Sequence, residues 1–438
     1  MTVAPPQPGL TLSLSVIGRR ALLDALIALV LFSLMVGIRT DEGAGIELTY
    51  VTRFSELATV IGLVFCGSIL VSLLRIWRNR ESSFAAPRQL ATITHSIVAN
   101  TARLLAPALL VFAVLFPILF HNNGYGIGLG IQVLTYVLLG WGLNIVVGLA
   151  GLLVLGYIAF YAIGAYACAL LATYFGWSFW VCLPLAGIVA ALAGILLGFP
   201  GSRLRGDYLA IVTLAFGEIV RLIIINWDHL TGGPNGLGNI PSPTLFGIPV
   251  NDSDQGLAAL LGIPFSPNHR FIYLYYLVLA LALITNWVTI RLRRLPIGRA
   301  WEALREDEVA CRALGINITT TKLTAFATAA MFGGFAGALF ASRVGFISPE
   351  SFTFQESALV LAIVVLGGMG SQLGTALAAI ALILLPEMFR DFGSYRMLVF
   401  GLAMVLIMAL RPRGLIGERS PTIVLEPSVL EPVSKSPK

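Results

Sequence analysis

Long apolar segments recur along the whole sequence, and they restrict its fold more than any other feature. A helix of about 20 mostly apolar residues is long enough to cross a lipid bilayer. The chain is 57% hydrophobic and only 11% charged, whereas soluble proteins carry about 25% charged residues. Lipid is therefore the expected surrounding of most of the chain. The candidate spans are residues 21–38, 56–77, 104–120, 128–149, 152–172, 178–199, 208–226, 271–290, 323–341, 357–387 and 395–410.

The stretch 357–387 is too long for a single simple crossing. Gly367-Gly368-Met369-Gly370 interrupts it, and Gly374 follows shortly after. Glycines at such a point indicate two half-spans or a re-entrant pair. The sequence therefore predicts an all-α, polytopic transmembrane helix bundle of about 10–12 spans with broken or re-entrant helices.

The basic residues predict the orientation of these spans. If the N-terminus lies in the cytoplasm, all but seven of the 28 Lys and Arg residues fall in inside segments, as the positive-inside rule expects. We therefore expect a multi-pass protein of the bacterial inner (plasma) membrane with both termini cytoplasmic. The seven exceptions are Arg39, Arg53, Arg221, Arg270, Arg343, Arg390 and Arg396.

The pattern also suggests three regions. Residues 1–120 form an N-terminal extension with about three spans, and residues 121–417 form the main bundle. The tail 418–438 contains Pro421, Pro427, Pro432 and Pro437 without apolar periodicity, so we expect it to be a disordered cytoplasmic segment.

Several classes of function are disfavoured. The net charge of +6 is spread between the spans rather than gathered in a patch, so nucleic acid is not an expected partner. The four cysteines form no C-x-x-C pair, and the four histidines all lie outside the spans. We therefore expect no metal site, no disulfide scaffold, no proton-relay cluster and no cofactor.

The inside loop 291–322 differs from the segments around it. From Arg299 to Leu314 it has the composition of a helix with a short apolar stripe, and Gly315 stands where a C-terminal helix cap is expected. An amphipathic helix resting on the membrane surface is one interpretation. The other is a docking helix that inserts into a groove of a cytoplasmic partner. Its candidate residues are Trp301, Glu302, Arg305, Glu306, Asp307, Glu308 and Gly315.

Motifs on both sides of this loop carry a resemblance. They are L-R-G-D-Y-L-A at the start of 204–238, L-R-E-D-E (304–308), A-L-G-I-N (313–317), I-S-P-E-S-F-T-F (347–354), V-L-G-G-M-G-S (365–371) and R-P-R-G-L (411–415). Together they make residues 125–417 similar to the LivM-type permeases of branched-chain amino-acid ABC importers. The first 100 or so residues resemble the extension of longer members. One departure is Val154-Leu155-Gly156-Tyr157, where many members carry Ser-Leu-Gly-Gln.

The resemblance implies a permease subunit rather than an enzyme. Its implied partners are a second homologous permease, two cytoplasmic ATP-binding subunits, a periplasmic substrate-binding protein and membrane lipid. The chain itself has no G-x-x-x-x-G-K-[ST] phosphate-binding loop, so ATP would be hydrolysed by the partner subunits. Urea, short amides and other small solutes stay open as substrates. An ion-coupled secondary transporter of small solutes is the alternative, and a membrane-embedded enzyme is a third class.

Three further groups are candidates for the transport machinery. Glu218 and Arg221 lie three residues apart within a span, so they share a helix face, either as a buried structural pair or in the translocation path. The turn Thr231, Gly232, Gly233 and Asn235 is either loop punctuation or a contact for the binding protein. Candidate helix breaks, or sites of close helix packing, are Gly148, Gly151, Gly156, Gly367, Gly368 and Gly370.

Overall fold

The computed structural model describes residues 106–121, 123–204, 206–244 and 267–388, the strands 38–42 and 48–52, and the positions 401, 404, 405, 414 and 415. Residues 21–37 of the first predicted span, the second predicted span 56–77, most of 395–410, and the tail 418–438 lie outside the described residues. Contacts divide the chain into two units, Met1–Thr101 and Ala102–Lys438. Each unit is described by itself.

The described part of the first unit is a hairpin that the apolar pattern did not predict. Strand β1 (Ile38–Glu42) pairs antiparallel with β2 (Leu48–Thr52), with Ile38 opposite Thr52 and Glu42 opposite Leu48. It falls in the segment between the first two predicted spans.

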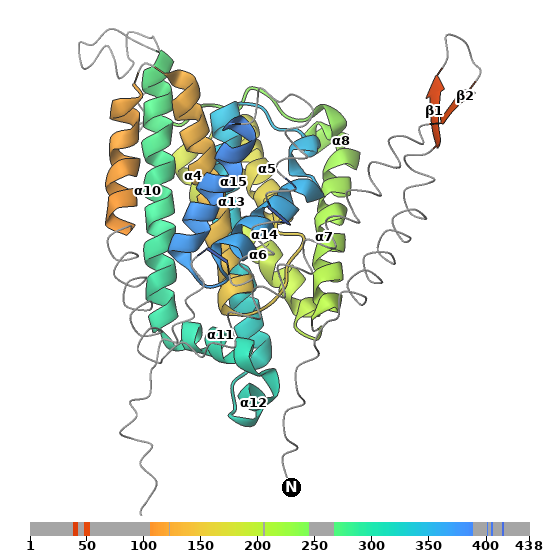
Figure 1. Ribbon diagram of the computed structural model, residues 1–438, viewed down its shortest axis with the longest axis vertical. Coiled ribbons are helices and arrows are strands. Elements are labelled where there is room, and N and C mark those ends of the chain that lie inside the picture. Colours follow the sequence, from red (N-terminus) through yellow and green to blue (C-terminus); the bar gives the residue numbers. More distant parts are fainter. Residues whose placement is uncertain are drawn as a thin grey trace, which may run out of the picture. The chain divides into compact units, whose positions relative to one another are not determined.

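The second unit is a bundle of helices (Figure 1). α13 packs against α6, α5 and α4, whereas α10 packs against α4. An unlabelled helix, Ala106–Leu119, precedes them. The labelled elements are α4 (Gly124–Asn144), a π-helix (Ile145–Leu149), α5 (Ile158–Phe175), α6 (Phe179–Gly201), α7 (Asp207–Asn226), α8 (Asp228–Thr231), the 3-10 turn η2 (Gly233–Asn235), α10 (Pro267–Arg294), α11 (Pro296–Glu306), α12 (Glu308–Ala313), α13 (Ile318–Val344), η3 (Pro349–Phe352), α14 (Phe354–Gly367) and α15 (Gln372–Met388).

The all-α polytopic fold is confirmed. Within the described residues, seven helical segments are long and apolar enough to cross a membrane, and Ala106–Leu119 and Gln372–Met388 are shorter apolar helices. The total of 10–12 spans stays a prediction, because several candidates lie outside the described part of the chain. The predicted span 152–172 begins later than expected, at Ile158, since residues 150–157 are not helical.

Small residues let the central helices approach closely. A Cβ atom at Gly164 of α5 would lie 2.3 Å from the Cα atom of Gly334 in α13. A Cβ atom at Gly337 would lie 2.1 Å from the carbonyl oxygen of Tyr161. In lipid, where helices gain little from the hydrophobic effect, such close backbone contact is a main source of association. α13 is therefore fixed at the centre, and it positions the interrupted helices beside it.

Candidate functional site

The first interruption follows α4. The helix widens into a π-helix at Ile145–Leu149, and the chain then runs without helical structure until α5 begins at Ile158. Gly151, within this segment, has a φ of +71°, which a glycine adopts without strain. The amide of Leu155 donates to the Thr213 hydroxyl at 3.0 Å, and the Ser357 hydroxyl donates to the Leu155 carbonyl at 2.5 Å. Side chains of α7 and α14 thus form hydrogen bonds with the backbone N–H and C=O groups of Leu155, which have no partner within a helix.

The segment 154–157, where the sequence departs from the LivM pattern, is buried in the core. Val154 and Tyr157 are each 1% exposed. The Tyr157 hydroxyl donates to the Ala329 carbonyl at 2.9 Å. Gly156 is pressed against α7, because a Cβ atom there would lie 1.8 Å from the Thr213 carbonyl oxygen. Val154 and Tyr157, the two positions that differ from the Ser-Leu-Gly-Gln pattern, therefore contribute to packing.

The second interruption separates α14 from α15. α14 ends at Gly367, Gly368 and Gly370 have φ angles of +103° and +92°, and α15 begins at Gln372. The fully buried Asn144 of α4 accepts a hydrogen bond from the Gly370 amide at 2.8 Å, and its amide group donates to the Ser371 carbonyl at 3.5 Å. The two interruptions consequently face each other, and Asn144 connects them.

Arg305 of α11 reaches the same place. Its guanidinium donates to the carbonyl oxygen of Gly148 in the π-helix. A Cβ atom at Gly151 would lie 2.7 Å from the Arg305 Cγ atom, and one at Gly370 would lie 3.5 Å from its Nη1 atom. We call Asn144, Gly148, Gly151, Arg305 and Gly370 the break junction. It joins α11, which lies outside the spans, to both non-helical segments.

The expectation of a single continuous helix over 299–315 is wrong. Two helices occupy this region, α11 and α12, and Asp307 separates them in an extended conformation with φ −158° and ψ 114°. The Asp307 carboxylate accepts hydrogen bonds from the amides of Val309 and Ala310 at 2.7 and 3.1 Å. It thereby caps the N-terminus of α12, which is the physical reason for the break.

The apolar stripe of α11 is used by the chain itself, so Trp301 and Leu304 cannot insert into a partner's groove. Both are buried, and the Trp301 indole donates to the Thr321 carbonyl at 3.1 Å. Glu302 pairs with Arg293 of α10 at 2.5 Å. These contacts hold α11 to α10 and α13.

Lys322 fixes α12 to the bundle. This residue, assigned by its sequence to the inside loop, lies in α13 and is only 1% exposed. Its ammonium donates to the carbonyls of Ser202 and Leu204 at 3.2 Å each, and it pairs with the Glu308 carboxylate at 3.4 Å. Three acceptors compensate the buried charge, and they tie the end of α6 and the start of α12 to α13.

α12 and the residues after it project from the bundle (Figure 1). Val309 is 64% exposed and Leu314 is 79% exposed, and Ala310 and Arg312 are also exposed. We call these four residues the α12 surface. Glu306 and Asp307 are exposed beside it, and Gly315, with a φ of +79°, follows it.

Glu218 and Arg221 form the expected pair, at 3.4 Å, but they are not buried within the chain. The exposed fractions of their side chains are 43% and 30%. They lie on a face of α7 that the described residues leave partly open.

The turn after α8 is mainly structural at three of its four candidate positions. The buried Thr231 hydroxyl donates to the carbonyls of Ile224 and Trp227 at 2.6 and 2.8 Å. Gly232 and Gly233 have positive φ angles, and a Cβ atom at Gly233 would lie 1.8 Å from the Asp228 carboxylate. Asn235 is exposed and open to a partner.

The sequence does not single out two groups of functional interest, Asn144 and the Tyr136–Glu356 pair. Asn144 could have been noticed, because it is a lone amide within an apolar run. The Tyr136 hydroxyl donates to the Glu356 carboxylate across α4 and α14, a pairing that no sequence spacing reveals. Among the described residues no three His, Cys, Asp or Glu side chains gather, and Cys168, Cys182 and Cys311 are free and buried.

Apolar helices long enough to span a membrane, with two non-helical segments that a surface helix contacts through Arg305, define a polytopic membrane protein. Comparison with known proteins then identifies the family. The chain belongs to the family of permease components of branched-chain amino acid transport systems, whose model matches residues 127–408. Residues 19–116 match a second model, described as a domain of unknown function.

Two LivM relatives match most of the chain. It is 54% identical over 329 residues to the high-affinity branched-chain amino acid permease protein LivM of Salmonella typhimurium, covering 74% of this chain and 77% of that protein. It is 47% identical over 414 residues to LivM of Escherichia coli, covering 92% and 96%. The autoinducer 2 import permease LsrC of Klebsiella pneumoniae is 28% identical over 220 residues, 47% of this chain and 56% of that protein. No solved structure matches.

The Lys322 contacts generate a stability prediction. Lys322→Met removes the donor to two carbonyls and leaves Glu308 without its buried partner, so we expect a loss of about 3–5 kcal/mol in unfolding free energy. Arg312→Ala is the matched control, since Arg312 pairs with the same Glu308 at 3.6 Å but is 67% exposed, and we expect about 0.5 kcal/mol or less. Unfolding in detergent measures both. Equal losses would contradict the anchoring role of Lys322.

Proposed function

We propose that the chain is a membrane-spanning permease subunit of an ATP-driven importer for branched-chain or related apolar amino acids. The observation that carries the proposal is the contact of Arg305 with the break junction, because Arg305 belongs to α11, which directly precedes the exposed α12 surface in the chain. A subunit driven by a separate ATPase needs such a connection, and this sequence contains no phosphate-binding loop motif. Family membership and the LivM relatives support the same conclusion.

The proposed assembly contains a second homologous permease, two cytoplasmic ATP-binding subunits and a periplasmic substrate-binding protein, within the lipid of the inner membrane. The α12 surface would then be cytoplasmic, as would both termini. This follows from the excess of Lys and Arg on that side of the spans. The opposite end, with the exposed Asn235, would face the binding protein.

The partly exposed face of α7 supports the proposal that a partner protein lies beside it within the membrane. A Glu and an Arg that are 43% and 30% exposed would be costly against lipid, where a central charge costs about 2.5–3.5 kcal/mol on insertion scales. Such a pair normally faces a protein neighbour or a water-filled route. We infer that this face of α7 meets the second permease or the translocation path between the two.

The proposed mechanism is alternating access. ATP-driven closure of the ATPases would move the α12 surface, and the Lys322–Glu308 pair would carry the displacement to α13 and the end of α6. α11 would move with it, and Arg305 would transmit that movement to Gly148 and the two interruptions. A helix break absorbs rotation more easily than a continuous helix, because its backbone hydrogen bonds are made by side chains that can rearrange.

Substrate selection would lie largely with the binding protein. In this conformation the Gly370 amide is occupied by Asn144, so a substrate carboxylate could bind there only after the break junction rearranges. The likeness to an autoinducer 2 permease extends over only about half of the chain, whereas the LivM relatives match most of it. Branched-chain amino acids are therefore the favoured cargo.

The ion-coupled alternative is disfavoured by the chemistry of the core. Coupling to protons or sodium calls for acidic groups or a relay within the spans. Away from their ends, the described spans contain the Glu218–Arg221 pair and Glu356, which accepts from Tyr136, rather than a chain of such groups.

The energy source is directly testable. In proteoliposomes holding the complete transporter and its binding protein, we expect uptake of labelled leucine to require ATP. A protonophore added at constant ATP should leave uptake unchanged, because the ATPases supply the free energy. Uptake that the protonophore abolishes at constant ATP would contradict the proposal.

The docking surface is testable by crosslinking. Val309→Cys and Leu314→Cys should crosslink to an ATP-binding subunit, whereas the control Asn235→Cys, at the opposite end, should not. The native Cys311 should interfere little, because burial and the carboxylates of Asp307 and Glu308 raise the pKa of its thiol. A raised pKa lowers the thiolate fraction, so modification of Cys311 by a maleimide should become faster only as pH rises. An ATPase captured by none of the positions on α12 would refute the docking role.

A further inference from the structure

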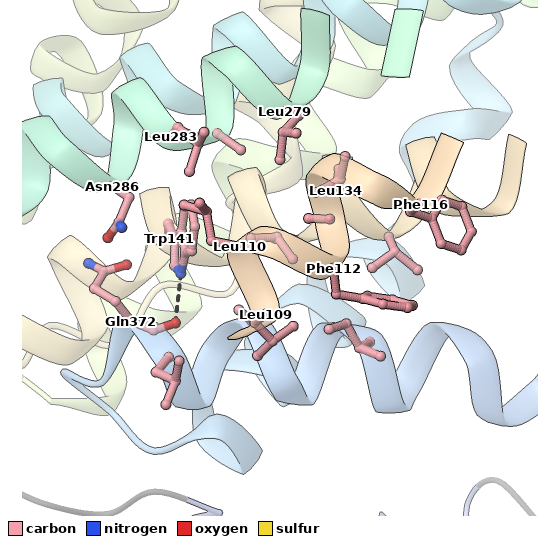
Figure 2. Close-up of a pocket in the computed structure, with 18 of the residues that line it drawn as sticks. Leu109, Leu110, Phe112, Phe116, Leu134, Trp141, Leu279, Leu283, Asn286 and Gln372 are labelled. Atoms are coloured by element: carbon pink, nitrogen blue, oxygen red, sulfur yellow. Dashed lines mark hydrogen bonds between the residues drawn. The ribbon is translucent and has the colours of Figure 1, made fainter. Parts of the chain in front are cut away.

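A cavity of about 370 Å³ lies between four elements of the bundle, namely helix Ala106–Leu119, α4, α10 and α15 (Figure 2). It is separate from the break junction and from the α12 surface. Almost all of its wall is apolar. The exceptions with hydrogen-bonding side chains are Trp141, Tyr275, Asn286 and Gln372.

Two of these four polar residues already have partners. The Trp141 indole donates to the Gln372 carbonyl at 2.8 Å, and the Tyr275 hydroxyl donates to the Ala113 carbonyl at 2.8 Å. By contrast, the side-chain oxygens of Asn286 and Gln372 are buried and accept no hydrogen bond from the described residues. A buried acceptor without a donor is destabilising, so this end of the cavity favours an occupant that brings one.

The dimensions of the wall indicate an elongated occupant. On α10 the lining runs from Tyr275 to Ile290, which spans about 22 Å at a rise of about 1.5 Å per residue. On α15 it runs from Gln372 to Leu384, about 18 Å on the same basis. Each exceeds the roughly 15 Å thickness of one leaflet's hydrocarbon. A hydrocarbon chain fits such a wall, whereas an amino acid would fill only a part of it.

The polar end determines the kind of head group. Figure 2 shows Asn286 and Gln372 at the same end as Trp141, with Phe112 and Phe116 at the other. With α10 centred on the bilayer, Asn286 lies about 8 Å from the midplane, still inside the hydrocarbon. None of the described lining residues is acidic, so an ammonium there would be uncompensated and costly. A hydroxyl is uncharged, and it both donates and accepts.

We propose that this cavity binds a long-chain amphiphile of the membrane whose head is an uncharged hydroxyl, with the chain along α10 and α15 and the hydroxyl at Asn286 and Gln372. The occupant joins helix Ala106–Leu119 to the core along the depth of the membrane. The site does not depend on the transported substrate or on ATP.

The test uses the complete transporter in lipid nanodiscs and a hexadecanol that carries a diazirine in its chain. After photolysis, we expect the label on residues lining the cavity, such as Phe112 and Ile380, and protection by unlabelled hexadecanol. Hexadecane, which lacks the hydroxyl, should compete roughly two- to tenfold less well. Asn286→Leu with Gln372→Leu should retain the label but remove the difference between the two competitors.

Two further variants test the place of binding. Ala282→Phe puts a ring into the cavity wall and should suppress labelling, and Ala376→Leu is a milder second filler if Ala282→Phe fails to fold. Ile188→Phe, on the exposed face of α6, is the control and should leave labelling unchanged. Labelling of the α6 face as strong as that of the cavity would overturn the proposal, as would equal competition by hexadecane and hexadecanol in the unmodified transporter.

Discussion

The structure depends on the requirement that backbone polar groups be hydrogen-bonded within lipid. An interrupted helix leaves N–H and C=O groups open, and each would cost several kcal/mol if it stayed unsatisfied in hydrocarbon. Here the two interruptions lie against each other. Asn144 accepts a hydrogen bond from the Gly370 amide, and Arg305 donates one to the Gly148 carbonyl. Non-helical backbone is thereby tolerated deep in the bundle.

This constraint explains why the surface helices are joined so firmly to the bundle. Arg305 of α11 donates a hydrogen bond to the Gly148 carbonyl of the π-helix, so α11 must be held in a fixed position. Trp301 and the Glu302–Arg293 pair hold it there. α12 is anchored separately by Lys322, while Val309 and Leu314 stay exposed. One face of this region is therefore committed to the chain itself, and the other is free for a partner. The division between α11 and α12, made by the Asp307 cap, separates these two roles.

The sequence predicted the fold class and the family well, because apolar length and short motif strings are local properties. It also indicated the glycine breaks, since Gly367, Gly368 and Gly370 interrupt an apolar run. It could not predict that Arg305 points inward, because the composition of 299–315 suits a surface helix equally well. For the same reason the sequence suggests that Trp301 contacts a partner, although its side chain is buried within the chain. Lys322 was placed in a loop, since its burial depends on carbonyls 118 and 120 residues away in sequence. Long-range pairing of this kind decides the site, and no spacing rule encodes it.

The central claim is that Arg305 carries the movement of the surface helices into the membrane. Arg305→Gln leaves the α12 surface intact, and Arg299→Gln, an exposed position on the same helix, is the matched control. The measurement is labelled leucine taken up per ATP hydrolysed by the reconstituted transporter, with assembly checked by subunit stoichiometry. We expect Arg305→Gln to assemble and hydrolyse ATP while this ratio falls at least about tenfold, the equivalent of one lost charge-assisted hydrogen bond. A ratio equal to that of Arg299→Gln would contradict the claim.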